Sequence, residues 1–274
     1  MRKLSFMFTM LVVFMLPWLG CGSSSSRNPA PTPTPVPQTQ TSTFAFMQSV
    51  AGQAGYYSPM IGTFTTTAGV TQFSSAAVVD SASNQVVTGN FYSIVLSADG
   101  KKVTVDLFGG LDRNTGRWDI WVANIDGSSM TQITSDGDSN RTPQFSPDGS
   151  KVIFISQRTS AGVSSLNVVA RRIDGSNEQV FQMPVGFSGA WAPTYSTDGS
   201  KIAMEMWGYD SNNAYYDGIV VMNADGSNLT LLTNPAGMDL NLHDQTPAFS
   251  ADGSKITFSR QAFGSSQEDV YIMN

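Results

Sequence analysis

The chain has 274 residues, of which 41% are hydrophobic and only 13% are charged. A chain of this length can bury a large core, and a single all-β domain of this size is ordinary. The formal net charge is −6, and it becomes −8 if Arg2 and Lys3 leave with a leader, because 13 basic and 21 acidic residues then remain. An acidic chain is poorly suited to the phosphate backbone, so we expect no nucleic-acid partner. The single cysteine, Cys21, excludes a disulfide within the chain and any cysteine-based metal cluster.

The first twenty residues have the features of a secretory leader. Arg2 and Lys3 precede the apolar run 4–16, and small residues follow at Gly20. The run stops at Pro17 and is shorter than the about 20 residues that a membrane-spanning helix needs. The segment therefore predicts export.

The segment Leu19-Gly20-Cys21 resembles the end of the bacterial lipoprotein signal, although Trp18 stands where that family usually carries Leu. The resemblance implies a lipoprotein signal peptide at 1–20 and a lipidated Cys21 that anchors the protein to a membrane. The alternatives are a secreted protein with an incidental cysteine and an uncleaved anchor. Gly22 stands where an inner-membrane retention signal would carry Asp, which favours the periplasmic side of the outer membrane or the cell surface.

Residues 21–43 form a predicted tether. The segment is rich in Ser and then alternates Pro with Thr or Ala, a composition that cannot bury a core and favours extended polyproline II. At about 3.1 Å per residue, some twenty residues hold a domain roughly 60 Å from the lipid surface.

A Ser-x-Asp-Gly turn organises the rest of the chain. In its clearest copy, Pro147 presets φ for a type I turn and Gly149 can take a positive φ without a Cβ clash. The Asp residues of the four copies are 49, 50 and 54 residues apart, and a second Asp-Gly-Ser turn follows the first three by 27, 26 and 27 residues. We predict structural roles for the turn residues, which are Asp99, Gly100, Asp148, Gly149, Asp198, Gly199, Asp252 and Gly253 in the first set and Asp126, Gly127, Asp174, Gly175, Asp225 and Gly226 in the second.

Two interleaved periods of about fifty residues indicate a supersecondary unit that repeats around a ring. In one unit the apolar runs fall at 193–196, 202–206, 219–223 and 229–233. Four such antiparallel strands joined by short turns make a propeller blade.

The pattern Pro-x-Phe-Ser-Pro-Asp-Gly-Ser-Lys-Val-x-Phe, followed by Ile-x-Val-x-Asn-x-Asp-Gly-Ser, resembles the TolB-type, WD-repeat-like β-propeller repeat over about 91–274. The resemblance implies an all-β propeller of four-stranded antiparallel blades. It does not imply an activity, because that repeat family ranges from envelope scaffolds to the propeller domains of peptidases.

We expect a propeller domain at 44–274 with about five blade units. The first unit is degraded, with strands expected at 44–48, 57–62 and 76–80, and it lacks a first strand and both turns. The last unit lacks a fourth strand, because its second turn would fall near position 279. The ring is therefore either closed imperfectly or part of a longer chain. The expected units are 44–90, 91–136, 137–184, 185–235 and 236–274.

The Asp-Gly turns share one face of such a propeller, so the opposite face, which carries longer loops, is the predicted binding surface. An aromatic, amide-rich stretch between the second and third strands of one unit suits stacking on a sugar or gripping a peptide, although Tyr and Trp also fill blade interfaces. The candidates are Asp136, Asp138, Asn140 and Arg141 from one loop, Trp191 from the next, His243 and Asp244 from a third, and Trp207, Tyr209, Tyr215, Tyr216 and Asp217 from that aromatic stretch.

His243 is the sole histidine, which excludes a multi-histidine metal centre and leaves one candidate base for a Ser-His-Asp arrangement. No Gly-x-Ser-x-Gly elbow accompanies it, so the alternative to a catalytic base is a loop residue whose side chain bonds to backbone.

The segment 136–140 has the alternating oxygen donors of a calcium loop but lacks the bidentate Glu, and an Asx-type turn is the alternative there. We therefore predict neither cofactor nor metal.

These features together predict a non-catalytic envelope lipoprotein whose propeller binds a protein or glycan partner. One alternative is a propeller-type polysaccharide lyase or hydrolase, resting on His243, Arg141 and Asp244. The other is a purely structural scaffold.

Overall fold

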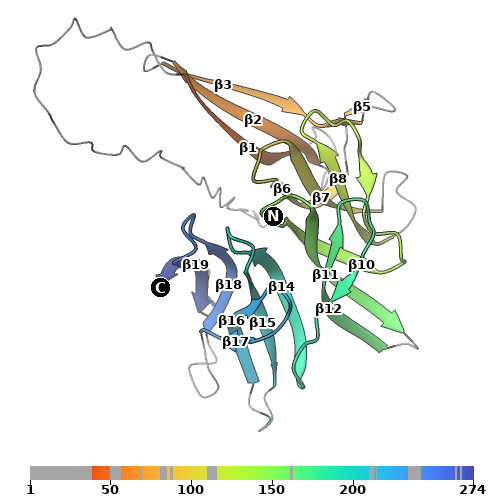
Figure 1. The fold of residues 1–274 in the computed structure, drawn as a ribbon, viewed down its shortest axis with the longest axis vertical. Coiled ribbons are helices and arrows are strands. Elements are labelled where there is room, and N and C mark those ends of the chain that lie inside the picture. The colour runs from red at the N-terminus through yellow and green to blue at the C-terminus, as the bar shows by residue number, and fades with distance from the viewer. Residues whose placement is uncertain are drawn as a thin grey trace, which may run out of the picture. The chain divides into compact units, whose positions relative to one another are not determined.

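The protein is built from β-strands. The computed structural model describes residues 39–49, 57–67, 70–80, 85–86, 89–109, 116–160, 163–209, 213, 215–233, 242–262, 264–265 and 267–274. This described part contains twenty strands and no helix, so it holds no helix that could cross a membrane. Five antiparallel sheets of three or four strands follow one another along the chain as a β-propeller (Figure 1). The predicted fold class is confirmed.

Three central units each have four strands in chain order, which is the meander predicted from the spacing of the turns. The second unit contains β6 (Asn90–Leu96), β7 (Lys102–Phe108), β8 (Trp118–Asn124) and β9 (Thr131–Gln132). The third contains β10 (Ser139–Phe145), β11 (Lys151–Ser160), β12 (Val163–Arg172) and β13 (Gln179–Val180). The fourth contains β14 (Phe187–Tyr195), β15 (Lys201–Tyr209), β16 (Tyr215–Asn223) and β17 (Thr230–Leu231).

The first unit differs from its prediction. Its sheet contains β1 (Gln40–Ser49), β2 (Tyr57–Thr67) and β3 (Val70–Ala77), while β4 (Val79–Asp80) pairs separately with β5 (Gln85–Val86). The predicted strand 76–80 was therefore wrong, since it divides between β3 and β4, and the last residues of the predicted tether belong to β1. The strands run further than expected because alternating Thr and Phe continue the pairing, and Phe44 covers Gly62, whose added Cβ would lie 2.5 Å from the ring.

The fifth unit has three strands, β18 (Leu242–Phe249), β19 (Ile256–Ala262) and β20 (Glu268–Met273). A fourth strand is absent from the described residues of this sheet, as the sequence predicts.

The core lies between successive sheets, and β11 shows how one strand serves two neighbours. Val152 and Phe154 pack in one cluster with residues of β8, whereas Ile153 and Ile155 pack in another with residues of β15. Alternate residues of a strand point to opposite faces, so a strand between two sheets must be apolar on both. This explains why the second strands have nearly continuous apolar runs.

The Asp-Gly turns are held by their own side chains. The Gly149 N–H donates to the Ser146 carbonyl at 2.8 Å, and Gly149 has a φ of 68°. The Asp148 carboxylate accepts the Ser146 hydroxyl at 2.6 Å and the Ser150 N–H at 3.0 Å. The same bonds recur around Asp198 and Asp252, which explains why the motif repeats.

A bulge interrupts the first strand of each of the last four units. The register shifts at this point in β6, β10, β14 and β18, and the last three carry a residue of positive φ before a proline: Thr142, Ala192 and Thr246. The first strands of successive units lie side by side. Bulges redirect side chains. The residue seven positions before the turn aspartate is equivalent in each of these units, and these residues are Tyr92, Arg141, Trp191 and Gln245. The last three directly precede the shift, whereas Tyr92 lies within it, after Phe91.

Asp106 joins two of these bulges. Its carboxylate is fully buried and accepts the Ser93 N–H at 2.6 Å within its own unit and the Thr142 N–H at 3.0 Å in the next unit. Since both donors are main-chain groups at bulges, this one side chain stabilises the irregular backbone on both sides of an interface.

Candidate functional site

Most of the predicted binding residues lie in strands rather than in loops. Asn140 and Arg141 begin β10, Trp191 lies in β14, and His243 and Asp244 begin β18. In an antiparallel meander these strand ends lie opposite the Asp-Gly turns, on the predicted side.

The aromatic stretch of the fourth unit is also strand, so its prediction as a loop was wrong. Tyr209 pairs with Tyr215, and Trp207 pairs with Asp217, at the ends of β15 and β16. The rings of Tyr209 and Tyr215 meet edge-on at 5.4 Å, and such cross-strand pairs extend a ladder beyond its apolar core. Tyr216 is buried in the core, whereas Tyr209 is 46% exposed.

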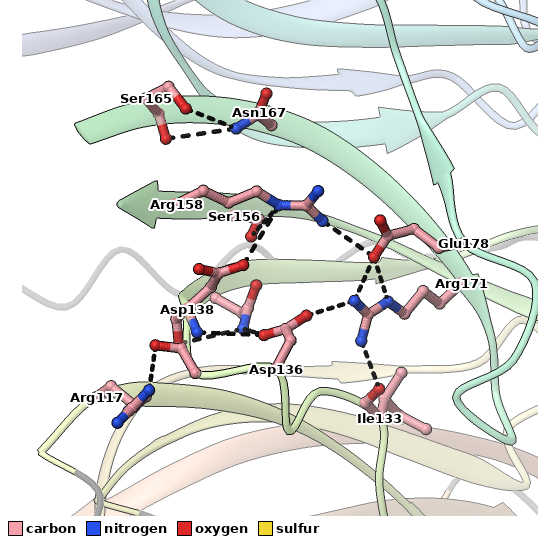
Figure 2. Close-up of polar contacts among 12 residues, drawn as sticks. Arg117, Ile133, Asp136, Asp138, Ser156, Arg158, Ser165, Asn167, Arg171 and Glu178 are labelled. Carbon is pink, nitrogen blue, oxygen red and sulfur yellow. Dashed lines mark hydrogen bonds and ion pairs between the residues drawn. The ribbon is translucent and has the colours of Figure 1, made fainter. Parts of the chain in front are cut away.

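Asp136 and Asp138 belong to a charged network between the second and third units (Figure 2). Arg171 lies at its centre, bonded to Asp136 and Glu178 and, at 3.2 Å, to the carbonyl of Ile133. Burial acts to raise the pKa of Asp136, but hydrogen bonds from Arg171 and from the Asp138 N–H outweigh it and leave that pKa lowered. The network therefore joins neighbouring units.

The calcium alternative for 136–140 fits this geometry poorly. One oxygen of Asp136 accepts the Asp138 N–H at 3.3 Å and the Asn140 amide at 3.4 Å, and the other is bonded to Arg171. Asp138 is paired with Arg158 at 3.4 Å. An Asx-type turn with arginine counter-charges accounts for these contacts.

Asp244 has a structural environment. It is fully buried, and Arg260 binds both of its oxygens, at 2.6 and 2.8 Å. The Arg260 guanidinium also lies 4.8 Å from the centre of the Tyr271 ring. An acid held in this way stabilises the fifth unit, and both of its oxygens are bonded to Arg260.

An aromatic cluster forms where the bulges meet, comprising Tyr92, Phe108, Trp118 and Trp191. The Tyr92 ring contacts Trp191 edge-on at 5.7 Å and Trp118 at 6.2 Å. Phe108 contacts Trp118 at 5.4 Å, and the Arg141 guanidinium lies over Trp118 at 4.6 Å. Tyr92 is 50% exposed and Phe108 40%.

Only Trp191 of this cluster was predicted from the sequence. The signal for Tyr92 was the equivalence of the repeats, because Tyr92 stands 49 residues before Arg141, and Arg141 stands 50 before Trp191. Trp118 and Phe108 follow from the register, which pairs them across β7 and β8.

A second group, here called the carboxylate–histidine cluster, contains Glu205, Asp217 and His243. The Nδ1 atom of His243 lies 2.6 Å from Asp217 Oδ2, and its Nε2 atom lies 3.6 Å from Glu205 Oε1. The side chains of Glu205 and Asp217 are 6% and 11% exposed, and that of His243 is 32% exposed. The fourth and fifth units therefore meet at this cluster. Sequence analysis did not identify Glu205.

The electrostatics of this cluster follow from burial and proximity. The hydrogen bond to Asp217 raises the pKa of His243, although partial burial opposes the shift. Burial raises the pKa of Glu205 to about 7, while the nearby imidazole acts to lower it. The cluster can thus hold a shared proton or an added positive charge. Trp191 pairs with Glu205 across β14 and β15, so this cluster adjoins the aromatic cluster.

Two cavities lie near the predicted sites. One of about 190 Å³ is lined by His243, Gln261, Ala262 and Gly264, at the end opposite the Asp-Gly turns. A larger cavity of about 290 Å³ lies between turns of the third and fourth units, where Asp148 and Asp198 each accept a backbone N–H within their own turn. The His243 cavity is therefore the one that lies beside predicted binding residues.

No protein-family model matches the chain. A TolB homologue from Chlorobium luteolum is 26% identical over 167 residues, which cover 60% of this chain and 33% of that protein. An uncharacterised protein of Agrobacterium fabrum is 28% identical over 146 residues, covering 52% of this chain and 47% of that one. A solved structure assigned as TolB from Agrobacterium tumefaciens superimposes with a TM-score of 0.54 at 17% identity, covering 79% of this chain and 73% of that one.

The propeller is TolB-like. The chain spans a third and about half of the length of the two curated relatives, so their whole activities do not transfer with the fold. The TolB-like propeller holds every candidate binding residue, whereas the predicted signal peptide, Cys21 and most of the tether lie outside the described residues.

Proposed function

We propose that the chain is a non-catalytic envelope protein whose TolB-like propeller binds a protein or glycan partner at the strand ends opposite the Asp-Gly turns. The observation that carries this proposal is the aromatic cluster, where exposed Tyr92 and Phe108 stand beside Arg141. Aromatic rings with one exposed face, next to a guanidinium, are the side chains that anchor protein interfaces and stack on sugars.

The envelope location rests on the N-terminal sequence. Arg2, Lys3 and the apolar run form the proposed leader, and acylation of Cys21 supplies the proposed anchor. The resemblance to TolB supports the same compartment. With residues 21–43 as a spacer, the binding end of the propeller can reach a partner away from the lipid, on the periplasmic side of the outer membrane or at the cell surface.

A propeller-type lyase or hydrolase is the second candidate. The hydrogen bond between Asp217 and His243 favours it, because a carboxylate that orients an imidazole is the usual arrangement of a general base. Loss of a measured turnover of polysaccharide or peptide in His243→Ala, with folding retained, would establish the enzyme and reject the non-catalytic proposal.

Photo-crosslinking in cells that produce the full chain tests the proposed function. A photoreactive residue at Tyr92 or Tyr209, both well exposed at the proposed binding end, is expected to capture one partner. The same residue at Asp225, in an exposed Asp-Gly turn, serves as the control and should capture none. Equal capture from Asp225 would contradict the assignment of the face, and absence of capture from every position would indicate a structural scaffold.

A further inference from the structure

The two ring nitrogens of His243 have different surroundings. Nδ1 lies 2.6 Å from Asp217 Oδ2, which is hydrogen-bond distance, whereas Nε2 lies 3.6 Å from Glu205 Oε1, which is too long for one. If Nδ1 carries the proton that Asp217 accepts, the lone pair of Nε2 faces the Glu205 carboxylate across a gap.

The width of that gap matches two ligands of one cation. Zinc ligands lie about 2.0 to 2.2 Å from the metal, and two of them at a tetrahedral angle are roughly 3.4 Å apart. Potential ligand atoms of Glu205, Asp217 and His243 all lie within 4.8 Å of one another.

The charges of the cluster also favour a cation. Glu205 and Asp217 are both largely buried, and within the described part of the chain no donor hydrogen-bonds to the Glu205 carboxylate. A buried carboxylate without a donor is costly, and one imidazolium cannot neutralise two carboxylates. A divalent cation would.

We propose that these residues form a site for one divalent transition-metal ion, with His243 Nε2 and Glu205 as ligands and Asp217 as the carboxylate that orients the imidazole. Metal-binding histidines commonly donate their second N–H to a carboxylate in this way. One imidazole nitrogen with carboxylate oxygen favours Zn²⁺ or Mn²⁺ over Ca²⁺ and Mg²⁺. This inference departs from the sequence prediction of no metal.

A cavity adjoins His243 in the fifth unit. It is about 190 Å³ and is lined by His243 and by Gln261, which pairs with His243 across β18 and β19. The Gln261 amide nitrogen donates to the Ser265 carbonyl at 2.7 Å, so its oxygen is the atom that can face a cation or its water. The ion would join β15 and β16 of the fourth unit to β18 of the fifth.

Equilibrium dialysis of the untagged full chain against Zn²⁺ and against Mn²⁺ tests the site. We expect one ion per chain, affinity reduced at least tenfold in Glu205→Gln, and a reduction of roughly 10- to 100-fold in Asp217→Asn. Glu268→Gln, the same change at an exposed glutamate of the fifth unit, should leave the affinity unchanged. Saturable binding that Glu205→Gln does not weaken would place the ion elsewhere and overturn the proposal.

Nuclear magnetic resonance of the wild-type protein gives a readout that needs no variant. His243 is the only histidine, so the imidazole resonances of the untagged chain belong to it without further assignment. Stoichiometric Zn²⁺ should shift the Nε2 resonance, and Mn²⁺ should broaden it selectively. An unchanged His243 spectrum at saturating Zn²⁺ would show that the cluster is only an ion pair between protein groups, even if Glu205→Gln fails to fold.

Discussion

At the scale of single residues, the turn aspartates contribute through the bonds that they accept. The hydroxyl of Ser196, followed by the backbone N–H of Ser200, lowers the pKa of Asp198 to about 2, and equivalent bonds from Ser250 and Ser254 lower that of Asp252 to about 2. The bonds are local to each turn, so the five-residue motif Ser-x-Asp-Gly-Ser suffices to form them.

This pKa shift predicts the acid stability of the propeller. A carboxyl whose folded pKa is depressed stabilises the fold above its unfolded value near 4, and the contribution is lost as pH falls from about 4 to about 2. Melting temperatures measured across that range should fall steeply for the wild type and less steeply for Asp198→Asn. Parallel slopes for the two proteins would contradict the role of the turn.

At the scale of elements, the interfaces between units depend on buried polar side chains. Asp106 accepts main-chain N–H groups from Ser93 and Thr142, in two successive units. The Asp106→Ala change leaves these donors buried without an acceptor, which we expect to cost about 3 kcal/mol or more of the free energy of unfolding. Urea denaturation measures this loss. Asp126→Ala, at an exposed turn, should cost about 1 kcal/mol or less, and equal losses for the two variants would reject the bridging role.

The pair of Asp244 and Arg260 makes a similar prediction within the fifth unit. Arg260→Met leaves a fully buried carboxylate without its counter-ion, and such losses cost about 3 to 5 kcal/mol. Arg172→Met provides the matched control, because its partner Asp174 is exposed and 3.8 Å away, in the range where pairs contribute about 0 to 1 kcal/mol. The comparison requires only denaturation curves, and a loss below about 1 kcal/mol for Arg260→Met would show that Asp244 has another role.

At the scale of the whole molecule, the propeller fold could be predicted because its signals are local and repeated. Each Asp-Gly turn is specified by adjacent residues, and the spacing of the turns sets the length of a unit. Strand ends were harder to predict, because Trp207 and Tyr215 continue a ladder after the apolar run has ended. The first unit, which lacks the turns, was correspondingly misread at 76–80.

The candidate site could be predicted only in part because it depends on contacts between distant residues. Glu205 and His243 are 38 residues apart and belong to different units, and Tyr92 and Trp191 are 99 apart. No short motif connects such pairs. Residue type alone identified His243 and Trp191 as candidates. Glu205 is a buried acid inside an apolar strand, and it becomes a candidate only through its contact with His243 of β18.

The most direct test of the proposed interaction module is the affinity of the protein for isolated envelopes of the cells that produce it. The full chain carrying Cys21→Ser, which removes the proposed lipid, should bind isolated envelopes saturably. We expect Tyr92→Ala to weaken this binding at least tenfold, because a central, exposed aromatic residue is a typical interface anchor. Tyr271→Ala, a change at a comparably exposed tyrosine of β20, should leave the affinity unchanged. Saturable binding that is equally strong with and without Tyr92 would contradict the assignment of the aromatic cluster as the binding surface.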